Sequence, residues 1–394
     1  MKLRRCAVLF LELVCEPRFE FRNLLSGGDG LAWMPRWRAW TTHPPVPVDV
    51  TLAEAEVLAD ELLRQDCELE QAQARHGSER IEALLAKGLL IGDHAEHEAL
   101  RAAEQHARDI AWWPLAAIAQ AQGGWQAVDV QARNEAGLMM DSQEIVDAFG
   151  AAPTPEYRRE PTRPALALLR PERGELDALL ARRKTCRNFD SDAQVSAQDL
   201  ATMLHRVWGA VGTLELAPGA VAVKKNSPAG GGLHAVEAYV LVQRAEGLAP
   251  GLYHYLALEH ALEPLRAMSA PEAATLAHQC VAGQHWFANV PVMAIMTARF
   301  DRLFWKYRRH TKAWRVVHLD VGHLSQTMYL SAADLGLGAF VTAAINDHDV
   351  DKALALQSMQ EGAIAVVGFG PRASQTVTLE LDDLMPTAAA LHSR

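Results

Sequence analysis

The 394-residue sequence has little cysteine, no long apolar run and an excess of negative charge. Its five cysteines are scattered without a C-x-x-C pair, which argues against a disulfide framework or a zinc site. Its net charge of -10 would repel a phosphate backbone, so nucleic acid is not expected as a partner. No segment approaches the roughly 18 uninterrupted apolar residues of a spanning helix. We therefore expect a soluble, cytoplasmic protein without a membrane-spanning segment.

The rest of the composition is that of a globular protein. Hydrophobic residues make up 49% and charged residues 22% of the chain, which excludes the fibrous and disordered classes. At roughly 150 residues per domain, the length predicts two or three domains, or a large domain with a smaller one attached. Four prolines between residues 151 and 164 exclude regular structure there. We expect an N-terminal region over 1–150, a linker over 151–168 and a second domain over 169–394.

The N-terminal region shows short helices and strand-like runs. The first apolar run predicts a strand, residues 51–64 and 79–90 have helical spacing, and residues 89–91 resemble a strand. Such elements can form a winged-helix unit, which binds DNA or peptides or serves as a structural module. Because the chain is acidic, a role without DNA is favoured. We expect this region to guide a peptide substrate or a partner enzyme.

After the linker, helices alternate with strands. One helix is expected over 171–183 with Leu176, Leu179 and Leu180 facing inward, and a second begins after Ser196. Runs of strand length occupy 238–242, 252–256, 292–297, 339–342 and 363–367. A long helix carries a near-heptad apolar stripe from Trp314 to Leu335, which we interpret as a dimer seam. The pattern predicts an α+β fold with one mixed sheet flanked by helices.

The first chemical constellation lies at the end of the helix expected over 171–183. Three cations and a hydroxyl fall close together there, an arrangement able to bind a phosphate monoester. The residues concerned are Arg183, Lys184, Thr185 and Arg187. An ordinary charged helix C-terminus is the alternative, since the helix dipole favours cations at that position.

The second constellation is a loop of small residues just before the strand at 238–242. Its three consecutive glycines let backbone amides come very close to a flat ligand. The candidate ligand-binding residues are Ser227, Pro228, Ala229, Gly230 and Gly231. The loop matches neither the P-loop nor the dinucleotide fingerprint, and a tight turn without a ligand is the alternative.

In this order, roughly 40 residues apart, the two stretches resemble the nitroreductase-like flavoprotein superfamily. The resemblance continues through residues 231–239, 250–255, 322–323, 335–338 and 368–371. In these stretches the sequence is similar to the SagB-type branch of peptide-maturation dehydrogenases. It implies a nitroreductase-like fold over about 170–372, FMN held by the two stretches, and a homodimer with FMN at its interface. Arg372 could add a phosphate contact, with an ordinary surface arginine as the alternative.

The SagB-type branch is defined by a Lys-Tyr pair, and this chain has Lys306-Tyr307. The resemblance implies that the pair is catalytic in oxidising a thiazoline or oxazoline of a modified precursor peptide to the azole. Tyrosine is a weak base at its ordinary pKa of about 10, but an adjacent ammonium favours the phenolate. The alternative is an exposed basic and aromatic segment without a catalytic role.

Two other functions remain open at this stage. The first is NAD(P)H-dependent reduction of dehydroamino acids or of nitro or quinone compounds, and the second is a non-catalytic peptide-binding scaffold. Partner maturation enzymes are expected in the peptide pathway. No metal site is expected, because His318, Asp320 and His323 do not share one helix face well.

Overall fold

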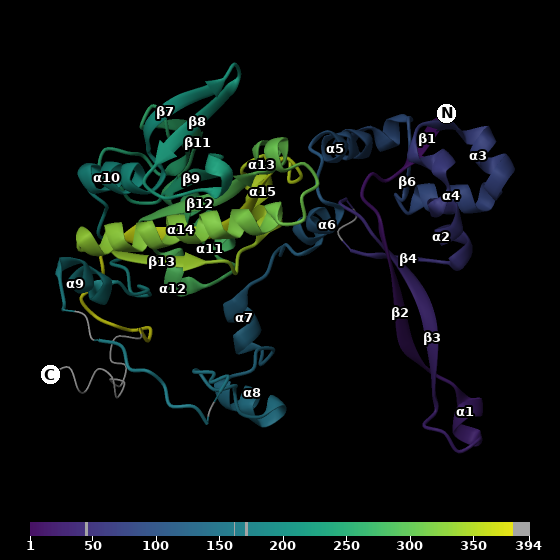
Figure 1. Cartoon of the computed structure of the whole chain (residues 1–394), viewed down its shortest axis with the longest axis horizontal. Helices are drawn as coiled ribbons and strands as arrows, with labels where there is room; N and C mark the ends of the chain where they lie inside the picture. Colours follow the sequence, from purple (N-terminus) through teal and green to yellow (C-terminus); the bar gives the residue numbers. More distant parts are fainter. Residues whose placement is uncertain (44–45, 161, 170–171, 381–394) are drawn as a thin grey trace.

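The computed structural model describes residues 1–43, 46–160, 162–169 and 172–380. Its largest sheet has six strands, which are β9 Val236–Val242, β10 Gly251–Leu256, β11 Ala261–Ala267, β12 Val292–Arg299, β13 Gly338–Thr342 and β14 Glu361–Gly370. The strand order is β11-β10-β9-β12-β14-β13, and Figure 1 labels β9, β11, β12 and β13 of this sheet. The five apolar runs expected as strands all lie in this sheet, so those predictions are confirmed.

The pairing within the sheet differs from the expected mixed pattern. All five pairs of neighbouring strands are antiparallel. Among the described residues, parallel pairing is confined to the isolated bridges Thr185–Ala339 and Val195–Ala245. The prediction of a mixed sheet is therefore wrong for the named strands, because apolar runs of strand length do not reveal strand direction.

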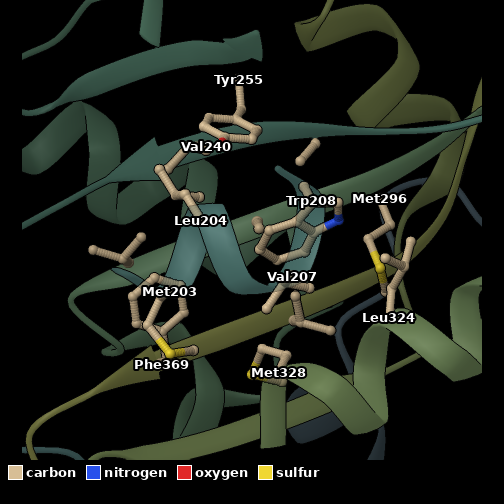
Figure 2. Close-up of a cluster of buried hydrophobic side chains, with 14 of the residues drawn as sticks. Met203, Leu204, Val207, Trp208, Val240, Tyr255, Met296, Leu324, Met328 and Phe369 are labelled. Carbon is tan, nitrogen blue, oxygen red and sulfur yellow. The ribbon is translucent and has the colours of Figure 1, made fainter. Parts of the chain in front are cut away.

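Helices cover both faces of the sheet. They are α9 Glu175–Arg182, α10 Ala197–Trp208, α11 Ala270–Cys280, α12 His285–Ala288, α13 Phe300–Tyr307, α14 Ala313–Asp334 and α15 Asp347–Ala353. Because side chains alternate along a strand, Val240 packs with α10 and α14, whereas Leu241 packs on the opposite face with α11 and α12. Figure 2 shows the first of these cores, with Trp208 of α10 among Met296 and Leu324. The domain is an α+β fold in three layers.

The apolar stripe of α14 lies inside this core. Val317 and Met328 are 1% and 0% exposed, and they pack against elements of the same chain. The assignment of this stripe to a dimer seam is therefore wrong, since its side chains are already covered. The reverse holds for α9, where Leu176 and Leu180, expected to face inward, are 62% and 44% exposed.

The N-terminal region contains a small sheet and several helices. Its strands and helices are β1 Lys2–Arg5, β2 Phe10–Phe19, α1 Phe21–Leu25, β3 Leu31–Trp40, β4 Val48–Val50, α2 Leu52–Ala59, η1 Glu61–Arg64, β5 Cys67–Glu68, α3 Leu69–His76, α4 Ser78–Ala86, β6 Leu90–Gly92, η2 Ala95–His97 and α5 Glu98–Asp109. The sheet order is β5-β1-β6, and α2 and α4 cover it through a core that includes Leu3, Leu58 and Ile81. Strands β2 and β3 form a long ribbon that extends away from the rest and ends at α1 (Figure 1).

Three more helices, α6 Pro114–Gln122, α7 Val130–Glu135 and α8 Ser142–Phe149, follow before the proline-rich stretch. The indole Nε1 of Trp112 donates to the Met359 carbonyl over 2.8 Å, and Ala117 of α6 shares a core with Phe300 and Phe304. Residues 112–118 thus pack on the second domain, although the domain bounds themselves remain a prediction. No helix among the described residues has the length and apolar character needed to cross a bilayer.

Candidate functional site

The glycine loop connects the hairpin of β7 Ala210–Ala217 and β8 Ala220–Lys225 with β9. Gly231 has a φ of 62°, in the left-handed region that favours glycine. A Cβ atom at Gly230 would lie 1.9 Å from Val316 Cγ1, and one at Gly231 would lie 2.3 Å from the Tyr307 hydroxyl. Both positions therefore require glycine, since α13 and α14 leave no room for a larger residue.

Side chains of α14 fix the conformation of this loop. The Gly230 amide donates to Asp320 Oδ1 over 2.9 Å, and the Ser227 and Thr327 hydroxyls lie 2.7 Å apart. Asp320 is 5% exposed, and burial raises its pKa although the Gly230 hydrogen bond opposes the rise. Pro228 is exposed and Ala229 is half-buried at the start of the turn. Asp320, considered from the sequence only as a metal ligand, is thus a positioning residue for the loop.

The Lys-Tyr pair ends α13 and contacts the glycine loop. Lys306 Nζ donates to the Gly231 carbonyl over 2.9 Å and lies 5.7 Å from the centroid of the Tyr307 ring. Two motifs separated by 75 positions in the sequence are therefore neighbours in space. The arrangement places an ammonium, a phenol and a glycine turn within one site.

A groove of about 520 Å³ opens beside this contact. Gly231 and Lys306 line one side, and Leu216 and Val221 of the β7–β8 hairpin line another. Trp305, which is 61% exposed, also lines it. The groove offers apolar and aromatic surface next to the Lys-Tyr pair, which suits a ring-containing segment of an extended ligand.

A buried charged group lies just behind the glycine loop. Lys225 is 6% exposed, and burial lowers the pKa of its ammonium, opposed by the nearby Glu237. His234 has a pKa lowered to about 4 by burial, then by the positive charges of Lys225 and Arg302. The imidazole is therefore neutral at physiological pH, and it adds no positive charge to this end of the site.

The predicted phosphate-binding residues lie in an extended segment after α9. The Thr185 hydroxyl is 3.0 Å from the Tyr329 hydroxyl of α14, and the Arg183 guanidinium lies over the Tyr329 ring, 5.3 Å from its centroid. Lys184 and Arg187 are both half-buried in the same segment. The sequence did not indicate Tyr329, which is contributed by a helix 144 positions away.

Oxyanion donors gather next to this segment, and a carboxylate of the chain uses them. Glu380 Oε1 accepts from the backbone amides of Arg187 and Asn188 over 2.7 and 3.1 Å, and Arg372 pairs with Oε2. Burial opposes ionisation of Glu380, but these hydrogen bonds prevail and lower its pKa. The donors thus hold the chain's own carboxylate, so this end of the segment has the type of donors that also bind a phosphate oxygen. Neither Glu380 nor Asn188 was indicated by the sequence.

The two halves of the candidate site meet on α14. The glycine loop contacts Thr327 of α14. The extended segment over 183–187, called the cation segment below, contacts Tyr329 of the same helix. Residues two apart on a helix point to nearly opposite sides, so the two segments approach α14 from different sides. The structure brings both segments to one helix without placing them on one face of it.

One group of metal-ligand types gathers among the described residues, outside this site. Cys6, His43 and Glu104 offer ligand atoms within 4.8 Å of one another. The Cys6 thiol donates to the Gly88 and Leu89 carbonyls, and burial raises its pKa well above the ordinary value. With the Cys6 thiol protonated, these three residues form a hydrogen-bonded cluster.

Residues 180–371 match the model of the Nitroreductase family. This stretch contains both motifs, the Lys-Tyr pair and the six-stranded sheet, so this part of the chain is similar to a domain of the nitroreductase family. Domains of this family are oxidoreductases that typically bind a flavin. The resemblance to the SagB-type branch is supported by the relatives described next.

Three relatives show how far the similarity extends. The nitroreductase-type protein MJ1384 of Methanocaldococcus jannaschii is 26% identical over 183 residues, which are 46% of this chain and 85% of that protein. Trifolitoxin-processing protein TfxB of Rhizobium leguminosarum bv. trifolii is 29% identical over 144 residues, 36% of this chain and 38% of the other. Microcin B17-processing protein McbC of Escherichia coli is 28% identical over 153 residues, 38% of this chain and 54% of the other. The similarity therefore spans less than two thirds of both processing proteins.

Proposed function

We propose that this protein is an FMN-dependent oxidoreductase of ribosomal peptide maturation, which oxidises a thiazoline or oxazoline in a precursor peptide to the azole. The observation that carries the proposal is the contact between Lys306 and Gly231, because it joins the Lys-Tyr pair to the glycine loop beside a groove. The names of two relatives, which process trifolitoxin and microcin B17, support a peptide substrate.

Taken one at a time, the two segments have the chemistry that the two ends of FMN require, although they reach α14 from different sides. The phosphate would be held by Arg183, Lys184, Thr185, Arg187 and Arg372, next to amides that already hold a carboxylate. The flat ring would lie against the turn formed by Ser227, Pro228, Ala229, Gly230 and Gly231, where glycine keeps the surface free of side chains. Bound FMN supplies the acceptor for the hydride that leaves the azoline ring.

The residues of the chain supply the proton transfer and the positioning. The phenolate form of Tyr307, favoured by the neighbouring Lys306 ammonium, takes up the acidified Cα proton of the azoline and becomes the phenol. Lys306 also holds the Gly231 carbonyl, and Asp320 holds the Gly230 amide, so the turn keeps its shape while the ring is oxidised. The groove lined by Trp305 and the β7–β8 hairpin receives the neighbouring part of the peptide.

The expected assembly belongs to the same proposal. A homodimer is expected from the resemblance, and its interface would use exposed apolar residues such as Leu176 and Leu180 of α9. The N-terminal region, with its bounds at 1–150, would guide the modified precursor peptide or a partner maturation enzyme towards the flavin.

The deciding experiment is an absorption spectrum of the freshly purified protein, followed by reduction assays. The proposal expects a yellow protein with one flavin per chain, bleached by an azoline peptide under anaerobic conditions. Rapid bleaching by NADPH without peptide would instead favour a reductase, to which the similarity along 85% of MJ1384 points. A colourless protein that binds no added FMN would leave only the peptide-binding scaffold.

A further inference from the structure

Four arginines line a cavity of about 280 Å³ between the N-terminal region and the second domain. Arg5 ends β1, Arg64 ends η1, Arg108 lies in α5 and Arg309 follows α13. Four segments distant in sequence thus each contribute one arginine to a single cavity. Arg5 Nη1 already donates to the Leu58 carbonyl and Arg108 Nη2 to the Arg5 carbonyl, which holds these two side chains in place without neutralising their positive charge. The concentration of positive charge is notable in a chain whose net charge is -10.

Acidic side chains of the chain compensate only part of this charge. Glu61 pairs with Arg64 over 3.1 Å, and Glu104 lies 3.7 Å from Arg108. Burial, followed by the repulsion of Arg64 and Arg108, lowers the pKa of Arg5 in spite of the attraction of Glu61. Two carboxylates therefore face four guanidinium groups, and the excess of positive charge favours an added anion.

The backbone around Arg309 is strained in a way that holds this residue at the cavity. Arg309 and Ala111 both have left-handed conformations, with φ of 51° and 56°. The Arg309 amide donates to the Ala111 carbonyl over 2.9 Å, which ties the loop to the end of the N-terminal region. Residues other than glycine rarely adopt such conformations, so the surrounding packing imposes them. Because Tyr307 is only two positions earlier, the cavity adjoins the segment that carries the Lys-Tyr pair.

We propose that this cavity is a binding site for an oxyanion, and that its occupant is a carboxylate side chain of an acidic segment in the peptide substrate. Guanidinium groups bind carboxylates through two parallel hydrogen bonds, so several of them can hold an extended acidic segment at defined points. The position at the junction suits a segment anchored on the N-terminal region while another part of the peptide reaches the groove. The choice of a peptide rests on the proposed function, whereas the anion site itself does not.

The test measures binding of a fluorescein-labelled hexaglutamate peptide to the full-length protein by fluorescence anisotropy at low salt. We expect hexaglutamate to bind and a hexaglutamine control not to bind. R309Q and R64Q should each weaken binding by about 10- to 100-fold, the range expected for the loss of one charge-assisted contact. R308Q is the matched control, since Arg308 is also exposed in the same loop but is not among the residues that line the cavity. The affinity of R308Q for hexaglutamate should stay within about twofold of the wild type.

Several outcomes would overturn the proposal. They are equal binding of both peptides, equal losses in R308Q and R309Q, and binding of inorganic phosphate in an Arg309-dependent manner without binding of hexaglutamate. The last result would reassign the site to a phosphate-bearing ligand. Flavin absorbance is recorded on the same samples, so a colourless protein that still binds hexaglutamate through Arg309 would contradict the proposed oxidation and leave the anion site standing.

Discussion

The two halves of the candidate site are held in different ways. At the glycine loop, Asp320, Thr327 and Lys306 fix the backbone, and a Cβ atom has no room. At the cation segment, backbone amides and Arg372 surround a carboxylate from the chain's own Glu380. Close packing around the backbone therefore fixes the glycine loop, whereas charged hydrogen bonds fix the cation segment. Substitutions should therefore separate turnover, controlled at the loop, from flavin affinity, controlled at the cations.

The largest effect is expected at the Lys-Tyr pair. Y307F removes the proposed base and K306M removes the ammonium beside it, so each should slow azoline oxidation by about 100-fold or more. Flavin content should remain that of the wild type, because neither residue belongs to the cation segment. Steady-state turnover with an azoline peptide gives the first quantity, and absorbance of denatured protein gives the second. R308Q serves as the control, and unchanged turnover in both variants would remove the pair from the mechanism.

The second effect is expected at the cation segment, where substitutions should weaken FMN binding and leave turnover unchanged. R187Q and R183Q should weaken FMN binding by about 10- to 100-fold, since each removes a charge-assisted contact to the phosphate. Turnover at saturating FMN should stay near that of the wild type. Fluorescence titration of the apoprotein with FMN measures the affinity, and R182Q at the exposed end of α9 is the control. Retention of native flavin occupancy by both variants would refute the phosphate site.

A smaller effect is expected within the glycine loop, where the chain offers its own control. G231A adds a Cβ atom 2.3 Å from the Tyr307 hydroxyl, whereas G232A has the same type of left-handed backbone, with φ of 69°, and no atom within 4 Å. Both variants should lose about 1–3 kcal/mol of stability from the backbone conformation. Only G231A should also lose about tenfold in turnover, because it displaces Tyr307. Equal turnover in the two variants would mean that the contact with Tyr307 is irrelevant to catalysis.

The sequence predicted the positions of the helices and strands better than it predicted which of their faces are buried and how the strands pair. The apolar periodicity of α14 and α9 correctly indicated two helices, yet the α14 stripe is buried within the chain while Leu176 and Leu180 of α9 are exposed. Periodicity identifies which residues share a face, but what covers that face depends on the arrangement of distant elements. The same limit explains why the antiparallel pairing of the sheet was missed.

The sequence indicated those parts of the candidate site whose signal is carried by composition alone, and their roles stay predictions. Glycine clusters and paired cations are visible in a sequence, and the structure places the loop against Lys306. Asp320, Tyr329 and Glu380 were not found, because each acts on a motif 90 or more positions away and is of an ordinary residue type. Only the fold brings such partners together.

The smallest expected effect is a difference between the two halves of the site in how they change the stability of the protein as the pH falls. His234, behind the glycine loop, has a pKa lowered to about 4, below the ordinary value of about 6.5. The unfolded chain therefore takes up a proton on this residue before the folded chain does, and stability is lost as the pH falls from about 6.5 to 4. The pKa of Glu380 is also lowered, so its contribution is present above the ordinary glutamate pKa and is lost only at lower pH.

H234N should flatten the loss of stability between pH 6.5 and 4, because asparagine tolerates the φ of 46° at this position and does not titrate in this range. E380Q should change the profile only below about pH 4.5, where the glutamate itself becomes protonated. Asp351, whose pKa is raised to about 6, contributes stability that is lost as the pH rises, but it is present in all three proteins and cancels in the differences. Thermal unfolding from pH 4 to 7 gives the three curves. The prediction fails if the stability of H234N and of the wild type changes with pH in the same way. In that case the neutral His234 does not cause the loss of stability in acid, and the two halves of the site would differ only in their effect on flavin binding.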